Sequence, residues 1–147
     1  MEKIELKPAS VFHYFDEICQ VPRPSKKEEK IIAYLMDFAE KHGLEAKKDE
    51  AGNILMKKPA TAGKENLKTV ILQSHIDMVC EKNSDSTHDF LNDPIETYID
   101  GEWLKAKGTT LGADNVSVWL PSWRYWLLTI SNMVLSNVSL LWMKKLA

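Results

Sequence analysis

Residues 69–77 read Thr-Val-Ile-Leu-Gln-Ser-His-Ile-Asp, and this stretch decides the fold class. Its first four residues are β-branched or apolar, which predicts a strand that is buried on both faces, as in α/β sheets. Two polar residues, His75 and Asp77, lie at the carboxyl end of that strand. Because open α/β sheets place ligands at this end, the stretch also predicts a site.

Helices and shorter strands are predicted on both sides of this strand. Apolar residues at helical spacing predict one helix over 11–19 and a second over 31–39. Ser25 and Glu28 have the spacing of a capping box, in which a hydroxyl and a carboxylate satisfy free amides where the second helix begins. Extended runs predict short strands at 44–49 and 53–57, joined by a hairpin or a tight connection at 50–52. They also predict a hairpin of 95–99 and 103–106 around Asp100-Gly101. The expected fold class is therefore α/β.

Composition excludes several classes of protein. The 147 residues suffice for one domain, and 44% are hydrophobic with a net charge of −2, which argues against a disordered tail or a basic nucleic-acid binder. The two cysteines, Cys19 and Cys80, form neither a disulfide framework nor a zinc-finger spacing. The first residues also lack the apolar run of a signal peptide. We expect a cytoplasmic protein without a nucleic-acid partner.

His75 and Asp77 form the first candidate site. Residues two apart on an extended backbone point the same way, so both side chains can enter one crevice. Imidazole is a common zinc ligand, and a nearby carboxylate can orient it. On so short a pattern, the more frequent explanation is a hydrogen-bonded histidine at a strand end.

The second candidate site is the stretch Gly-Thr-Thr-Leu-Gly-Ala-Asp-Asn at residues 108–115. Two glycines among small and polar residues predict a tight loop that presents Asp114. A carboxylate can bridge two metal ions, as two-metal hydrolases require. The alternative is a plain turn in which the aspartate caps a helix.

Together, Ser-His-Ile-Asp-Met-Val-Cys-Glu-Lys-Asn at 74–83 and the loop at 108–115 resemble the bacterial aminoacyl-histidine dipeptidases. These are cytosolic, carnosinase-like co-catalytic zinc exopeptidases related to peptidase T. Pro-Arg-Pro-Ser at 22–25 and Gly52-Asn53 resemble the same family. The resemblance implies that residues 1–115 are the N-terminal part of an α/β/α metallopeptidase catalytic domain, with an incomplete sheet and without the family's lid domain.

The resemblance also implies a role for each candidate residue. His75 would ligate one zinc, Asp77 would have the catalytic role of orienting that histidine, and Asp114 would bridge two zincs. The intact enzyme would be a dizinc metallo-dipeptidase that hydrolyses Xaa-His dipeptides such as β-Ala-His. Other divalent metals could replace zinc, and the lid domain would mediate a homodimer.

Residues 116–147 differ in composition from the rest of the chain. They contain none of the 21 acidic residues, none of the six glycines and four of the five tryptophans. Where the family continues Gly-Ile-Gly after the aspartate and asparagine, this chain continues with Val116. We expect residues 116–147 to be an out-of-frame tail without a native fold.

The genetic code supports a frameshift after Asn115. In the frame that joins the third base of one codon to the first two of the next, Trp142-Met143 can encode only Asp, and Met143-Lys144 only Glu. Both are forced because Trp and Met have a single codon each. This Asp-Glu lies where the family carries its Asp-Glu-Glu motif, with a catalytic glutamate and a ligand glutamate.

Two expectations follow for the chain as written. It carries two of the five expected metal ligands, so we expect this truncated polypeptide to be inactive as a dipeptidase. The alternative is a membrane-associated binding module, because residues 127–142 form an apolar stretch with tryptophans near its ends. Interrupting serines and asparagines, together with its short length, count against a span.

Overall fold

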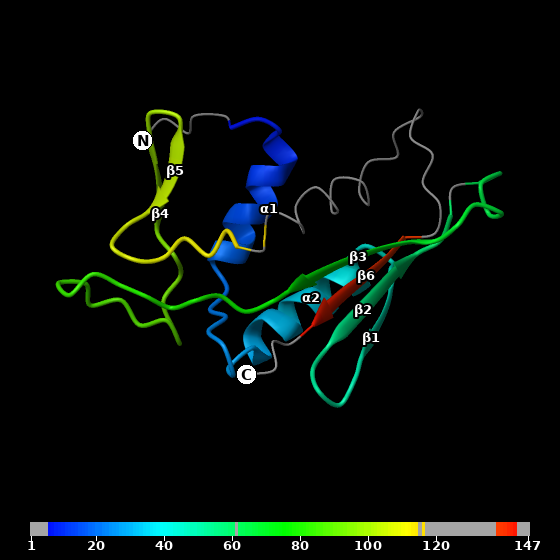
Figure 1. The fold of residues 1–147 in the computed structure, drawn as a ribbon, viewed down its shortest axis with the longest axis horizontal. Coiled ribbons are helices and arrows are strands. Elements are labelled where there is room, and N and C mark those ends of the chain that lie inside the picture. The colour runs from blue at the N-terminus through cyan, green and yellow to red at the C-terminus, as the bar shows by residue number, and fades with distance from the viewer. Residues whose placement is uncertain (1–5, 61, 115, 117–137, 144–147) are drawn as a thin grey trace.

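The computed structural model describes residues 6–60, 62–114, 116 and 138–143 (Figure 1). These residues have an α/β fold, as the sequence predicts. The helices are α1 (Ala9–Cys19) and α2 (Glu29–Lys41). The strands, in chain order, are β1 (Glu45–Lys48), β2 (Ile54–Lys58), β3 (Val70–His75), β4 (Thr97–Asp100), β5 (Trp103–Ala106) and β6 (Val138–Met143).

Two sheets are formed by these strands. The larger has the order β1-β2-β6-β3, in which β6 runs antiparallel to β2 and parallel to β3. β1 and β2 form the predicted antiparallel pair around a turn at Gly52. The smaller sheet is the predicted hairpin of β4 and β5 (Figure 1). The hairpin is tied to α1 because the Ile95 amide donates to the Cys19 carbonyl at 2.9 Å.

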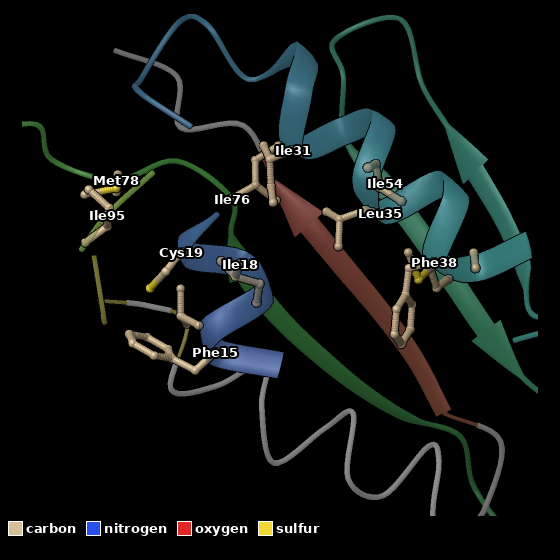
Figure 2. Close-up of a cluster of buried hydrophobic side chains, with 13 residues drawn as sticks. Phe15, Ile18, Cys19, Ile31, Leu35, Phe38, Ile54, Ile76, Met78 and Ile95 are labelled. Carbon is tan, nitrogen blue, oxygen red and sulfur yellow. The ribbon is translucent and has the colours of Figure 1, made fainter. Parts of the chain in front are cut away.

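One core joins both helices to the larger sheet. Phe15 and Ile18 of α1 and Leu35 of α2 are buried in the same cluster as Ile54 of β2 and Ile76, which follows β3 (Figure 2). Alternate residues of β2 point into this core, as expected of a strand with one face covered by a helix. The core therefore fixes the position of the chain just beyond β3, where the predicted site lies.

The prediction that β3 is buried on both faces is wrong. Ile71 is 65% exposed, and Gln73 is also exposed. β3 lies at the end of the sheet, with β6 along one edge, and its Ile71 face is not covered by any described element. An apolar run predicts burial only where other elements cover both faces of the sheet.

α2 does not begin at the predicted capping box, which would have placed the start of the helix at Ser25. α2 begins at Glu29 without a side-chain cap, and the Glu28 carboxylate instead accepts a hydrogen bond from the Lys26 amide at 2.5 Å. Lys26 has a positive φ of 69°, so the chain turns sharply here. The Ser25 hydroxyl faces Asp77 instead of the helix.

The tail contributes one strand to the larger sheet. β6 pairs with β3 from Val138 opposite Val70 to Met143 opposite His75. We expected no native fold for residues 116–147. The backbone of 138–143 lies within the sheet and Val116 is buried, whereas 117–137 and 144–147 lie outside the described residues.

The described helices are all too short or too polar to cross a membrane. The predicted apolar anchor at 127–142 falls partly outside the described residues. Its last part belongs to β6.

Candidate metal centre

His75 and Asp77 lie side by side where β3 ends. His75 Nδ1 is 3.0 Å from Asp77 Oδ1 and 3.1 Å from the Asp77 carbonyl oxygen. Both oxygens are acceptors, so Nδ1 carries the proton that is donated to them. In the neutral imidazole, this arrangement leaves the lone pair on Nε2, which is the tautomer that a metal-binding histidine needs.

Asp77 is held from a second direction by Ser25. The Ser25 hydroxyl donates a hydrogen bond to Asp77 Oδ2, while Oδ1 faces the histidine. Asp77 is only 6% exposed. A buried carboxylate needs such partners, because burial without them strongly disfavours its charged form. Ser25 and Asp77 therefore fix the orientation of His75 together.

The loop that carries Asp114 is docked along the segment after β3. The Asn83 amide donates to the Gly108 carbonyl at 2.9 Å, and the Thr110 amide donates to the Glu81 carbonyl at 2.8 Å. The Thr110 hydroxyl also donates to the Val79 carbonyl at 2.6 Å. These bonds attach the first half of the loop to the chain that leaves the His75 strand.

Asp114 lies at the end of this loop and faces His75. Its Oδ1 is 3.9 Å from His75 Nε2, and its side chain is 96% exposed. This distance is too long for a hydrogen bond. The fold nevertheless brings the side chains of these two residues close together, although they lie far apart in the sequence.

Arg23 joins three segments of the site. Its Nη1 donates to the Ile18 carbonyl at 3.0 Å, and its Nη2 donates to the Gly112 carbonyl at 2.8 Å. Its own carbonyl accepts from the Met78 amide at 3.1 Å. Burial lowers the pKa of Arg23, and the nearby Cys19 thiol acts in the opposite direction. An arginine still remains charged under these conditions.

The donor set fits a zinc ion in part. Zinc bonds to nitrogen and oxygen are about 2.0–2.2 Å long, so two ligand atoms 3.9 Å apart can reach one ion between them. His75 has the tautomer and Asp114 the carboxylate that such an ion requires. Among the described residues, no group of three or more His, Cys, Asp or Glu side chains is positioned to hold a metal. The described part of the chain thus supplies two ligands of a centre.

Sequence reasoning missed the supporting residues. Ser25 was assigned to a helix cap, and Arg23 had no role beyond its place in the Pro-Arg-Pro-Ser stretch. Both act on residues more than 50 positions away, since Ser25 is 52 positions from Asp77 and Arg23 is 89 from Gly112. The only sequence signal for them was the resemblance at residues 22–25, which carries no information about contacts.

A separate cavity of about 650 Å³ lies beside the first part of the loop. It is polar and includes Asp85, His88, Glu96 and Lys107, but none of His75, Asp77 and Asp114. The cavity is therefore distinct from the candidate centre, which is defined by the convergence of its side chains and not by a hollow.

Comparison with known proteins agrees with the fold and the motifs. The chain is 53% identical over 114 residues to the cytosol non-specific dipeptidase of Escherichia coli, a match that covers 78% of this chain and 24% of that protein. It superposes on the aminoacylhistidine dipeptidase of Vibrio alginolyticus with a TM-score of 0.87 and 45% identity, over 95% of this chain and 28% of that one. No protein-family model matches the chain.

A more distant structure shares the fold. Aminopeptidase PepT of Bacillus cereus superposes with a TM-score of 0.74 at 21% identity, over 92% of this chain and 36% of that one. The chain spans about a quarter of the length of the two nearer relatives. The chain is therefore similar to one part of these two bacterial dipeptidases.

Proposed function

We propose that residues 1–115 supply one half of a dizinc centre that hydrolyses Xaa-His dipeptides such as β-Ala-His in the intact protein. The observation that carries the proposal is the convergence of His75 and Asp114, with Asp77 behind the histidine. The names of the relatives support peptide hydrolysis as the reaction class. By the family resemblance, the intact protein would be a cytoplasmic homodimer.

Each residue has a distinct task in this proposal. His75 binds metal through Nε2, Asp77 keeps the proton on Nδ1, and Asp114 offers a carboxylate that can bridge two ions. When bound, the metal pair polarises the scissile carbonyl and lowers the pKa of a water molecule. The exposure of Asp114 leaves its carboxylate open to an ion and to a small substrate.

We expect the 147-residue chain to bind metal weakly and not to hydrolyse β-Ala-His. Two protein ligands leave the coordination shell of a zinc ion open, whereas a catalytic zinc site usually has three. A divalent ion would then be held with modest affinity, and a second ion would share only the Asp114 carboxylate. Zinc-dependent hydrolysis of β-Ala-His by the pure chain would contradict the expected inactivity.

The test is a cobalt titration of the whole chain, followed by optical absorption and competition with zinc. We expect His75→Ala and Asp114→Ala to remove the absorption bands of bound cobalt. The matched control is Asp100→Ala, which removes an exposed aspartate that ends β4 and pairs with Lys105, away from the candidate centre. Cobalt binding that is unchanged by both site substitutions would overturn the proposed centre.

A further inference from the structure

We propose that Arg23 is a positioning residue, which sets the distance between Asp114 and His75 by tying the Asp114 loop to the end of β3. The inference rests on the proposed metal centre and extends it to a residue that touches neither metal nor substrate. Arg23 is 1% exposed, and its guanidinium reaches carbonyls of two different segments. The planar guanidinium binds the two carbonyls through two different nitrogens, Nη1 and Nη2.

The first half of the Asp114 loop has its own attachments, but the second half depends on Arg23. Thr110 is fastened by backbone and hydroxyl hydrogen bonds to the segment after β3. Gly112, two residues before Asp114, has its carbonyl bound by Arg23 Nη2 at 2.8 Å. Among the hydrogen bonds that attach the described loop to the rest of the chain, this one lies nearest in sequence to Asp114.

The backbone of Arg23 controls the other side of the site. Its carbonyl accepts the Met78 amide, and the neighbouring Pro24 forms an isolated parallel bridge with Met78. Met78 directly follows Asp77, so Arg23 holds the chain that carries the His75–Asp77 pair as well as the loop. Arg23 thus connects the end of α1 to both the His75–Asp77 segment and the Asp114 loop.

Gly112 is shaped to receive this guanidinium. A Cβ atom at Gly112 would lie 2.6 Å from Arg23 Nη2 and 3.0 Å from Met78 Sδ. The 2.6 Å contact with Nη2 is shorter than Cβ contacts in real proteins essentially ever are. A larger residue would therefore displace the loop or the arginine. The glycine also has a φ of +70°, which side chains rarely adopt. Arg23 can bind the Gly112 carbonyl at this distance because residue 112 has no side chain.

The test separates positioning from general stability with two pairs of variants of the whole chain. Arg23→Lys keeps the positive charge but replaces the two separated Nη atoms with a single Nζ, whereas Arg23→Met removes the charge as well. Gly112→Ala brings a Cβ against the guanidinium. Gly108→Ala is its matched control, because Gly108 lies in the same loop with φ +69° but its nearest contact would be 3.6 Å, to Ser86.

Two readouts are measured for every variant, cobalt affinity and amide hydrogen exchange. We expect Arg23→Lys and Gly112→Ala to weaken cobalt binding about tenfold or more, in the range typical for residues that orient metal ligands. We expect Gly108→Ala to keep most of the affinity. Exchange should accelerate at the amides of residues 112–114 in Arg23→Lys, whereas the Thr110 amide and the amides of α2 should keep their protection.

Three outcomes would overturn the inference. The first is native cobalt affinity in Arg23→Lys. The second is an equal affinity loss in Gly108→Ala and Gly112→Ala. The third is a loss of protection in α2 as large as at residues 112–114, which would make Arg23 a general stability residue. If the unsubstituted chain binds no cobalt through His75, the proposed metal centre fails, and the exchange data alone decide whether Arg23 positions the loop.

Discussion

The Ser25 hydroxyl donates a hydrogen bond to Asp77 Oδ2, although the two residues are 52 positions apart. The other oxygen of the same carboxylate accepts from His75 Nδ1. Ser25, Asp77 and His75 therefore form a short chain of hydrogen bonds that reaches the imidazole at Nδ1, whereas Nε2, on the other side of the ring, is turned toward Asp114. An outer group of this kind sets the orientation and basicity of the ligand in front of it.

Removing the Ser25 hydroxyl should weaken metal binding without unfolding the chain. In Ser25→Ala, Asp77 keeps one partner but loses the donor to Oδ2, so the carboxylate can rotate away from His75. We expect cobalt affinity to fall about tenfold. Ser25→Thr retains a hydroxyl and serves as the control, with nearly native affinity. Equal losses in the two variants would show that the hydroxyl is not the cause.

Alkaline pH should destabilise the chain partly through Cys19. Burial raises the pKa of the Cys19 thiol from about 9 to about 11, and nearby Arg23 opposes the shift. The fold thus favours the neutral thiol. This thiol stabilises the folded chain fully below about pH 9, where Cys19 is protonated in both the folded and the unfolded chain. The contribution is lost as the pH rises toward 11, and it amounts to roughly 2 to 3 kcal/mol of unfolding free energy.

Denaturant unfolding of Cys19→Ala at several pH values measures this contribution. We expect the variant to be less stable than the native chain at neutral pH, because it leaves a small cavity, but to lose less stability between pH 9 and 11. Cys80→Ala is the comparison, since Cys80 is half-buried and its pKa is raised by burial as well. An identical pH dependence in the native chain and Cys19→Ala would refute the assignment.

The exposed edge of the larger sheet should promote self-association. β3 is the last strand of the described sheet, and Ile71 on it is 65% exposed, so an apolar side chain of an edge strand faces solvent. We expect Ile71→Lys to lower light scattering of the concentrated chain with little change in its stability. Leu91→Lys, which removes an exposed leucine from a loop, should have a smaller effect. A monodisperse native chain would contradict this expectation.

The frameshift remains a prediction that DNA sequencing can test. The forced Asp spans the codons of Trp142 and Met143, and the forced Glu those of Met143 and Lys144, so with the G restored they would be residues 143 and 144. In β6, position 143 lies opposite His75. The shifted reading would therefore bring a carboxylate to the end of β3 that carries the candidate centre. Sequencing should show a missing G after the Asn115 codon and an open shifted frame. Early stop codons in that frame would refute it.

Local sequence patterns predicted most elements of the fold correctly. The helical spacing of apolar residues gave the two helices, and turn residues at Gly52 and Gly101 marked the two hairpins. These features depend on neighbours within a few positions, where propensity and turn chemistry act directly. The chemistry of His75, Asp77 and Asp114 was also visible as residue types at a strand end and in a glycine loop.

Sequence patterns alone thus predicted the helices, the hairpins and the chemical character of three side chains. Three further features follow only from the packed structure: Ile71 is exposed, Ser25 binds Asp77 instead of capping α2, and Arg23 reaches Gly112. Each of these depends on which distant segment packs alongside, and hydrogen bonds over 52 or 89 positions leave no periodic signal in the chain. Burial and long-range contacts are properties of the packed molecule, because they exist only after the core has brought the segments together.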